Sequence, residues 1–392
     1  MSKSFTVTKV ACYIGYIVQA IVNNFLPILF IALQDIYALN YEQLGRIILV
    51  NFLTQMATDF FTPKILKYIG YKRACVLAQI SAFIGLCLLG ILPRIMHNTY
   101  LAILIAMTIT AFGSGLIEVV ISPMVEMLPT KNKVGNMAVL HSFYCWGQVF
   151  TVLVTTAMIF ITGFNNWAYI PLIWSLVPLF NFFMFLKSPV IEPEKEQKQD
   201  SFKKLFSSRR FRCYLIMMLC AGASEIAMAQ WASMFAQQTL KVSKTIGDLA
   251  GPCAFAIFMG AGRIWYAKIS DRISFKKLMV ILSSLCFICY VTVAFCQIQF
   301  IALIFCALCG FTVSIFWPGT YSAGAKDFKN GGAVMFSAFA MLGDIGCSLG
   351  PWLLGVVADK LDLKFGFLTV AIFPVAMIIA TLISVKEDKK LP

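Results

Sequence analysis

The feature that most constrains this chain is a succession of apolar segments of about 20 residues or more, separated by short polar breaks. A soluble fold has no interior for so many of them, since 60% of the residues are hydrophobic and 13% charged. Soluble domains are about half apolar and about a quarter charged. The chain is therefore predicted to be an all-α membrane protein. We expect twelve transmembrane helices, at about 7–33, 42–64, 72–93, 99–124, 136–162, 167–187, 213–238, 246–268, 276–297, 299–323, 333–357 and 365–385.

The longest polar stretch separates the first six predicted spans from the last six. We therefore expect an N-terminal six-helix half at residues 1–190, a cytoplasmic linker at 191–212 and a C-terminal six-helix half at 213–392. A long charged linker between equal halves is typical of transporters built from two repeats. An alignment that places Gly147 over Gly343, and hence Gln148 over Asp344, favours such a repeat.

The distribution of Lys and Arg predicts the orientation in the membrane. With the N-terminus inside, 26 of the 32 Lys and Arg residues fall in cytoplasmic segments. Because cytoplasmic loops of membrane proteins carry the excess of positive charge, both termini are expected on the cytoplasmic side of the cell membrane. This distribution also accounts for the net charge of +14, so we expect a lipid bilayer and no nucleic acid as the partner.

The cysteines lie within the apolar segments, and no disulfide framework is expected. Two pairs have C-x-x-C spacing, Cys286 with Cys289 and Cys306 with Cys309. On a membrane helix this spacing places two small apolar side chains on one face. No further ligand is evident beside either pair, so neither a metal nor a cofactor is expected.

Residues 262–277, which follow the eighth predicted span, read GRIWYAKISDRISFKK. This segment resembles the cytoplasmic loop motif of the major facilitator superfamily, with Ala and Ser in place of two of its glycines. The resemblance implies the six-plus-six fold of that superfamily. It also implies a conformational latch at Asp271 and Arg272, with Arg263 beside them. In the first half Lys67 stands where the motif has Asp, which predicts a weaker latch there.

Residues 113–123 read GSGLIEVVISP and resemble the fucose:proton symporter-like branch of the superfamily. That branch has G-x-G-x-x-E and then Pro on its fourth helix, which implies sugar binding or proton coupling for Glu118. The carboxylate that the branch has on its first helix has no counterpart in residues 19–24. Residues 140–148 and 222–233 also resemble segments of Firmicutes transporters of this superfamily.

Four titratable groups within the spans are candidate proton-coupling residues, because a charge at mid-membrane costs about 3 kcal/mol or more. Glu225 and Asp344 lie near span centres with no cation partner evident in the sequence. Glu118 and His141 flank the loop between the fourth and fifth spans at similar depth, and we expect them to face each other directly or through one water. The alternative for each group is a structural hydrogen bond between helices, with the acid protonated.

Amide and indole side chains within the spans suit a neutral polar solute such as a sugar. On the fifth span a polar stripe recurs at helical spacing and is expected to face a cavity; its members are His141, Cys145, Gln148 and Thr151 or Thr155. The same residue types also join membrane helices to one another, which is the alternative. The candidate substrate-binding residues are Asn24, Gln55, Trp146, Gln148, Gln230, Trp231 and Trp317.

These patterns favour a secondary transporter that moves a sugar or related metabolite by alternating access, with proton coupling. The sequence contains no ATP-binding P-loop and no catalytic motif, so we expect no enzyme. A proton-driven efflux pump for hydrophobic or cationic drugs is the alternative, since acidic groups and Met-rich surfaces suit it equally. A nutrient-sensing receptor is a third hypothesis. We expect a monomer whose partners are a small-molecule substrate and protons.

Overall fold

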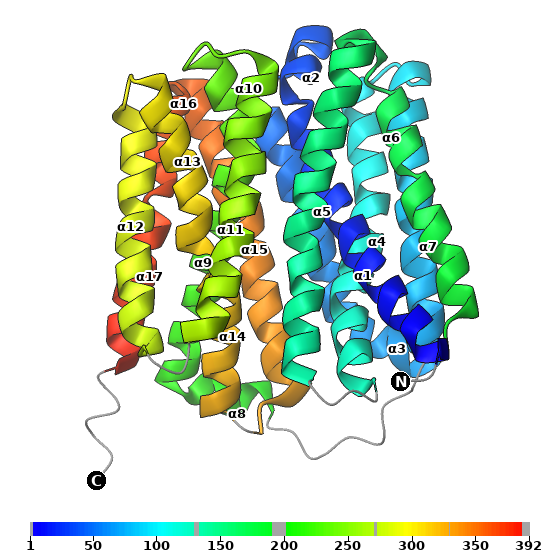
Figure 1. Cartoon of the computed structure of the whole chain (residues 1–392), viewed down its shortest axis with the longest axis vertical. Coiled ribbons are helices and arrows are strands. Elements are labelled where there is room, and N and C mark those ends of the chain that lie inside the picture. Colours follow the sequence, from blue (N-terminus) through cyan, green and yellow to red (C-terminus); the bar gives the residue numbers. More distant parts are fainter. Residues whose placement is uncertain (1–2, 129–132, 190–200, 270–272, 329, 386–392) are drawn as a thin grey trace. The chain divides into compact units, whose positions relative to one another are not determined.

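The computed structural model describes the chain except for residues 1–2, 129–132, 190–200, 270–272, 329 and 386–392. The described residues form helices joined by short loops, as Figure 1 shows. Eleven of these helices are long and apolar enough to cross a membrane. The protein is therefore an all-α membrane protein, as predicted. The chain divides into two compact units, residues 1–39 with 50–195 (the N-terminal unit) and residues 40–49 with 196–392 (the C-terminal unit).

The N-terminal unit contains the first six predicted spans, apart from the start of the second, and several of them bend or break. Pro27 lies inside the first span and has no N–H, so the Asn23 carbonyl loses its helical hydrogen bond there. The longest helix, of 55 residues, turns sharply at Gly70, where φ is 73° and ψ is 169°. The elements are α1 (Lys3–Ile28), α2 (Phe30–Tyr37), α3 (Tyr41–Ile95), α4 (Thr99–Met127), α5 (Lys133–Thr162), η1 (Phe164–Asn166), α6 (Tyr169–Trp174) and α7 (Leu176–Lys187).

The predicted second span, residues 42–64, is the first arm of α3. It is helical, but it is not among the eleven strongly apolar helices of the described chain. The reason is the polar side that it turns into the protein, where Asn51, Gln55 and Asp59 are all buried. A span whose inward side is amide and carboxylate reaches a lower mean hydropathy than one that packs through apolar residues.

The C-terminal unit contains the other six predicted spans, three of which are assembled from consecutive shorter helices. One break is a π-helical turn that contains Pro252, and another, at residues 314–315, is followed by Pro318 in the first turn of α14. The elements are α8 (Phe202–Ser207), α9 (Arg209–Gln238), α10 (Lys244–Asp248), η2 (Leu249–Cys253), α11 (Ala254–Ile269), α12 (Phe275–Phe295), α13 (Gln299–Val313), α14 (Phe316–Asp327), α15 (Gly332–Lys360), α16 (Leu363–Val370) and α17 (Ile372–Val385).

Glycines allow α9 and α15 to approach each other at the backbone. A Cβ atom added to Gly222 would lie 2.1 Å from the carbonyl oxygen of Gly343, and one added to Gly346 would lie 2.0 Å from that of Leu219. Helices in lipid gain little from hydrophobic association with each other, so close packing through small residues is a main source of their attraction.

The corresponding contact of the N-terminal unit involves Gly147 of α5. A Cβ atom there would lie 2.9 Å from the Cβ of Ala20 and 3.0 Å from the Cα of Ile17, both in α1. Gly343, which the sequence alignment superposes on Gly147, meets the first long helix of its own unit through its carbonyl oxygen, which lies beside Gly222. Its Cα side faces Trp317 instead, so the two glycines contact corresponding helices with different sides.

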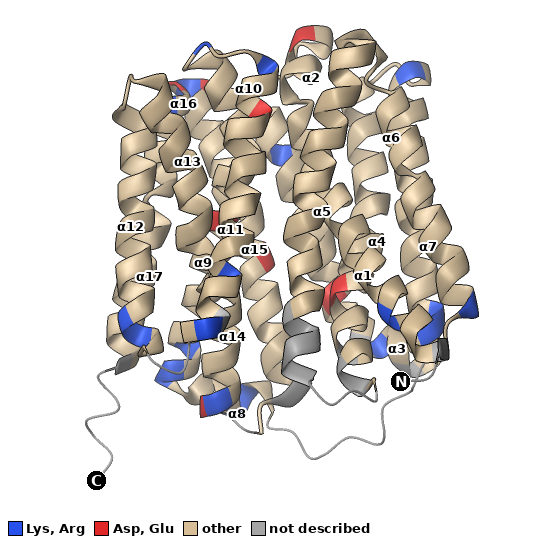
Figure 2. Ribbon diagram, in the orientation of Figure 1, with Lys and Arg blue, Asp and Glu red and all other residues tan. Residues whose placement is uncertain are grey.

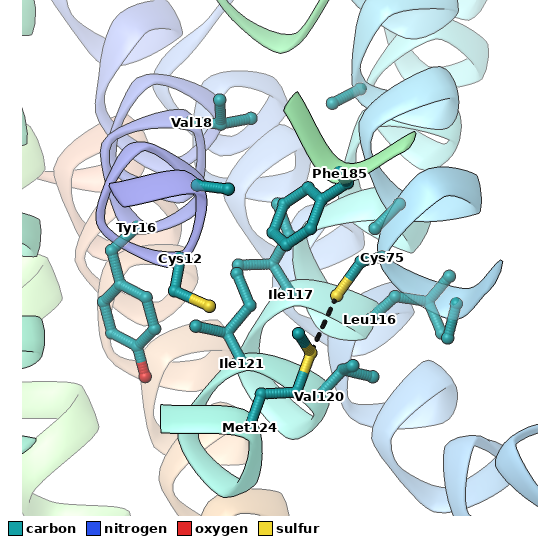
Figure 3. Close-up of a cluster of buried hydrophobic side chains, with 14 of the residues drawn as sticks. Cys12, Tyr16, Val18, Cys75, Leu116, Ile117, Val120, Ile121, Met124 and Phe185 are labelled. Carbon is teal, nitrogen blue, oxygen red and sulfur yellow. Dashed lines mark hydrogen bonds between the residues drawn. The ribbon is translucent and has the colours of Figure 1, made fainter. Parts of the chain in front are cut away.

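An apolar cluster joins α1, α4, α7 and the second arm of α3 in the N-terminal unit (Figure 3). Cys12 and Tyr16 enter it from α1 and Phe185 from α7, while Cys75 and Met124 place their sulfur atoms 3.3 Å apart. The cluster fixes the rotation of α1 about its own axis relative to α4. This rotation determines which partners the polar residues of α1, Gln19 and Asn23, can reach.

In each unit, Lys and Arg gather at one end of the helices. Figure 2 shows them at the C-terminal end of α7 in one unit, and at the start of α12 and the end of α14 in the other. These ends belong to the segments that the Lys and Arg distribution assigns to the cytoplasm.

Replacing Gly346 by Val should destabilise the C-terminal unit by about 3 kcal/mol, because overpacking at a backbone contact forces α9 and α15 apart. The measurement is the thermal unfolding of the detergent-purified protein. Leu349→Ala, on the more exposed side of the same helix, is the control and should change stability much less. Equal stability of Gly346→Val and the wild type would show that this close contact is not part of the folded packing.

Candidate functional site

A buried network of amides connects three helices of the N-terminal unit. The Nδ2 of Asn51 and the Nε2 of Gln55 donate to Oδ1 of Asn23, at 3.1 Å and 2.9 Å. Ser114 of α4 donates from Oγ to Oε1 of Gln55 at 2.8 Å. All four residues are buried. The network therefore places neutral donors and acceptors within the membrane-spanning part of the unit.

Helical spacing explains how the network forms. Gln19 and Asn23 stand four residues apart on α1, as do Asn51 and Gln55 on α3, so each pair lies on one side of its helix. The two amide sides meet between the helices. Asn23 and Asn51 are amides of the same kind as the candidates Asn24 and Gln55, and the sequence pattern suits hydrogen bonds to hydroxyls in all four.

The G-x-G motif of α4 allows this helix to pack closely on both arms of α3. A Cβ atom on Gly115 would lie 2.8 Å from the Cβ of Thr58 in the first arm. One on Gly113 would lie 2.6 Å from the carbonyl oxygen of Ala78 in the second arm. The two glycines thus face two neighbouring helical segments, and this packing brings Ser114 to its partner in the amide network.

Glu118, one turn further along α4, is half-buried and accepts a hydrogen bond from Gln19. The distance from Nε2 of Gln19 to Oε2 of Glu118 is 2.9 Å. Near it, the Tyr16 hydroxyl lies 2.8 Å from Oγ of Ser122, and the Tyr16 ring meets the exposed His141 ring edge-on at 5.2 Å. Helix α1 therefore contacts both Glu118 and His141. Their direct pairing stays a prediction.

The candidate residues Asn24, Trp146 and Gln148 differ in their surroundings. Asn24 donates from Nδ2 to the Ala20 carbonyl at 2.9 Å and to the Tyr144 hydroxyl at 3.3 Å. Gln148 is buried in α5, whereas Trp146 is 48% exposed. Asn24 and Gln148 thus lie inside the unit, and Trp146 lies on its surface.

The polar stripe of the fifth span can end at Thr151 or at Thr155, and Thr155 lies inside the unit. This residue is fully buried, and its Oγ1 accepts a hydrogen bond from Nε1 of Trp174 at 3.0 Å. Within a membrane an indole N–H needs an acceptor from the protein. The Thr155 side chain thus joins α5 to α6 within the N-terminal unit.

In the C-terminal unit, Arg263 of α11 approaches Glu225 of α9. The distance from Nη2 of Arg263 to Oε1 of Glu225 is 3.8 Å, and the Glu225 side chain is almost completely buried. The expectation that Glu225 has no cation partner is therefore wrong. It failed because the arginine side chain is long enough to carry its charge about a helical turn away from its own backbone.

Asp344 lies buried on α15, directly after the glycine that contacts Trp317. A Cβ atom on Gly343 would lie 2.1 Å from Cη2 of Trp317, so the indole ring lies flat against this part of α15. The Trp317 ring also stacks with that of Tyr321, at 6.2 Å and 27° between planes. Trp317 and Asp344 are thus neighbours in the C-terminal unit.

Gln230 and Trp231 are buried on α9. A Cβ atom on Gly355 of α15 would lie 3.2 Å from Cζ2 of Trp231. Trp231 thus packs between α9 and α15. This is the alternative to substrate binding, in which such a residue joins two membrane helices.

Of the three residues of the predicted latch, the structure describes one. Asp271 and Arg272 lie outside the described residues, and Arg263 contacts Glu225. A different ion pair joins the start of α9 to the end of α14, with Nη1 of Arg210 3.3 Å from Oδ2 of Asp327. The Tyr214 hydroxyl donates to the same oxygen at 2.6 Å. The sequence did not reveal this contact, because its members are more than a hundred residues apart.

A second buried ion pair fixes the other end of α9. Lys244 and Ser233 both donate to Oδ1 of Asp248, which is fully buried. Gln237 donates from Nε2 to Oγ of Ser233 at 3.0 Å. The spacing of four residues between Lys244 and Asp248 is the sequence signal of such a helical ion pair.

Comparison with known proteins agrees with this architecture. The family model of the Major Facilitator Superfamily matches residues 12–351. The solved structure of the E. coli fucose:proton symporter FucP is similar at 16% identity and a TM-score of 0.68, covering 97% of this chain and 99% of that chain.

Two further solved structures are similar over nearly their whole length. A D-xylose-proton symporter shares 12% identity at a TM-score of 0.78, covering 98% of each chain. The nucleoside transporter NupG, as a D323A mutant, shares 15% identity at a TM-score of 0.76, covering 96% of this chain and 100% of that chain. No curated protein matches the sequence. At these identities the likeness of the structures establishes the fold.

Replacing Arg263 by Gln should destabilise the protein by about 3 kcal/mol, because Glu225 then remains buried without its cation. The double variant Glu225→Gln/Arg263→Gln should recover most of this loss, which gives a coupling energy of about 1–3 kcal/mol in a thermodynamic cycle. Thermal unfolding of the purified variants measures it.

The control is Lys268→Gln, which removes an exposed charge from the same helix and should leave stability nearly unchanged. Losses that simply add in the double variant would contradict an interaction between Arg263 and Glu225.

Proposed function

Because this chain belongs to the major facilitator superfamily, we propose that it is a proton-coupled transporter that takes up a neutral polar solute of the sugar class. It works by alternating access as a monomer in the cell membrane, with both termini cytoplasmic. Residues 1–190 and 213–392 form its two halves, and 191–212 link them.

The observation that carries this proposal is the buried amide network around Asn23. Asn51, Gln55 and Ser114 contribute neutral hydrogen bonds to it, and such groups can exchange their mutual bonds for bonds to solute hydroxyls. An anionic solute would need a buried cation, whereas these bonds each join two neutral side chains. The network therefore suits a neutral solute.

The solute class also agrees with two of the similar structures, which are a fucose:proton symporter and a D-xylose-proton symporter. Solute-binding groups in the C-terminal unit are proposed to be Gln230, Trp231 and Trp317. In the N-terminal unit they are Asn24, Gln55, Trp146 and Gln148, to which the network adds Asn23 and Asn51.

The proposed proton carriers are Glu118, His141, Glu225 and Asp344. A carboxylate only accepts hydrogen bonds, whereas a protonated carboxyl can also donate one, so each protonation step changes what the group can bind. Gln19 can satisfy Glu118 in both states, because an amide has a donor and an acceptor. Arg263 favours the charged state of Glu225.

Glu225→Gln and Asp344→Asn should each abolish solute accumulation driven by a pH gradient, because neither amide can carry a proton. The measurement is uptake into proteoliposomes with an imposed gradient, using labelled pentoses, hexoses and nucleosides. Asp362→Asn, at an exposed helix cap where Asn also accepts the hydrogen bond, is the matched control. If both variants accumulate solute like the wild type, neither carboxyl couples protons to transport.

Asn23→Ala should raise the half-saturation concentration of the transported solute about tenfold, because the amides of Asn51 and Gln55 lose their shared acceptor. Concentration series in the same proteoliposomes measure the change. Asn166→Ala removes an Asn that is hydrogen-bonded at the exposed end of the same unit and should have no such effect. An unchanged half-saturation concentration in Asn23→Ala would show that the amide network is not part of the solute-binding site.

The same vesicles test the alternative of drug efflux. Proton-driven movement of hydrophobic cationic dyes, with no flux of any sugar or nucleoside, would replace the uptake proposal with an efflux pump.

A further inference from the structure

A short basic segment precedes the first span of the C-terminal unit and has no part in the proposed solute site. It comprises α8 and the first turn of α9, residues 202–212, and reads FKKLFSSRRFR. Five of these residues are Lys or Arg, and none is Asp or Glu. The segment also contains three Phe residues, so charge and apolar surface lie close together along it.

Two phenylalanine rings of α8 lie exposed on one side of the helix. Phe202 and Phe206 are 47% and 45% exposed, and their spacing of four residues places them on the same side. The two rings stack on each other, with centroids 5.5 Å apart and planes at 27°. Such an apolar pair is stabilised when a partner removes it from water.

Other residues of the segment fix it to the C-terminal unit. Leu205 and Phe211 are buried, and the Phe211 ring meets that of Phe202 at 6.4 Å and 77° between planes. Arg210 forms the ion pair with Asp327 at the end of α14. The two exposed rings therefore belong to a preformed surface.

The basic side chains beside the rings are exposed, namely those of Lys203, Lys204, Arg209 and Arg212. Arg212 also donates from Nη1 to the carbonyls of the last two residues of α8, at 2.8 Å and 2.9 Å. Its guanidinium carbon lies 5.9 Å from the centroid of the Phe206 ring. Arg212 thus closes the end of α8 and places a positive charge directly beside the apolar side.

The position of α8 explains what this surface meets. α9 begins at Arg209 and is long and apolar enough to cross a membrane, so the segment directly before it is expected at the bilayer surface. Figure 2 shows α8 at the same Lys- and Arg-rich end of the unit as the end of α14. Lipid head groups and the first part of the acyl chains are the surroundings of a surface helix at this depth.

We propose that residues 202–212 form a binding site for anionic phospholipids of the leaflet at this end of the helices. The exposed Lys and Arg side chains bind the head-group phosphate, while the rings of Phe202 and Phe206 insert beside the acyl chains. Long basic side chains can reach the head groups from such a position, and clusters of them next to a span attract anionic lipids. The site anchors the end of the linker to the membrane and does not depend on which solute is transported.

The linker itself is the competing occupant of this surface. Its residues 192–200 read EPEKEQKQD and lie outside the described residues. They could neutralise the basic side chains, but they contain no aliphatic or aromatic side chain other than Pro to cover the two rings. A phospholipid supplies both the negative charge and the apolar chains, so it fits the whole surface.

The experiment titrates the full-length protein in detergent with phosphatidylglycerol or phosphatidylcholine and counts bound lipid by native mass spectrometry. The wild type should bind phosphatidylglycerol at least about tenfold more tightly than the zwitterionic lipid. Lys203→Gln/Lys204→Gln/Arg209→Gln should lose this preference. Phe202→Ser/Phe206→Ser should bind both lipids more weakly, because the apolar contact with the acyl chains is removed.

The matched control is Lys241→Gln/Lys360→Gln/Lys364→Gln, which removes three charges near the opposite ends of α9 and α15 and should bind lipid like the wild type. Thermal unfolding in detergent checks that each variant is folded. Should the charge variant fail to fold, the lipid preference of the wild type and the weaker binding of the Phe variant still decide.

Four results would overturn the proposal. They are a wild type without preference for phosphatidylglycerol, a preference that survives in the folded charge variant, displacement of the lipid by an equal concentration of glycerol phosphate, and binding that appears only after the acids of residues 192–200 are replaced by amides. The third result would indicate a site for free phosphates. The fourth would show that the linker occupies the surface.

Discussion

Close approach of helix backbones at glycines is the interaction on which both units depend. Lipid offers little hydrophobic drive for one membrane helix to associate with another, so contact at short distance must supply the attraction. Gly222 and Gly346 allow α9 and α15 to meet, and Gly113 and Gly115 do the same for α4 and α3. Each of these contacts lies within a few residues of an acid inside the protein, so the packing also determines which groups surround that acid.

The three acids that are candidate proton carriers differ in their partners. Glu118 receives an amide hydrogen bond from Gln19, Glu225 lies near the cation of Arg263, and Asp344 lies beside the glycine that Trp317 covers. An amide tolerates either protonation state, whereas a cation favours the charged one. The acids are therefore unlike each other in the work needed to protonate them.

The sequence predicted the helical fold and the polar residues within the spans, because hydropathy and charge are properties of single segments. It could not predict contacts between helices, which depend on how each helix is rotated about its axis. The pairing of Gln19 with Glu118, across 99 residues, is such a contact, and so is the approach of Arg263 to Glu225. The cysteines show the same limit at a shorter range, since only the hairpin of α12 and α13 brings the two C-x-x-C pairs together.

The first helix separates this chain from the symporter branch that its fourth helix resembles. Where that branch has a carboxylate on the first helix, residues 19–24 of this chain contain amides. Gln19 contacts Glu118 directly, but an amide cannot exchange a proton with it. Under the proposed coupling, a larger part of the proton transfer then falls to the C-terminal unit. Protonating Glu225 gives up its attraction to Arg263, and the guanidinium can then take another partner. A solute hydroxyl can accept a hydrogen bond from Arg263, and solute binding would then favour proton binding at Glu225, which is the thermodynamic linkage that a symporter needs.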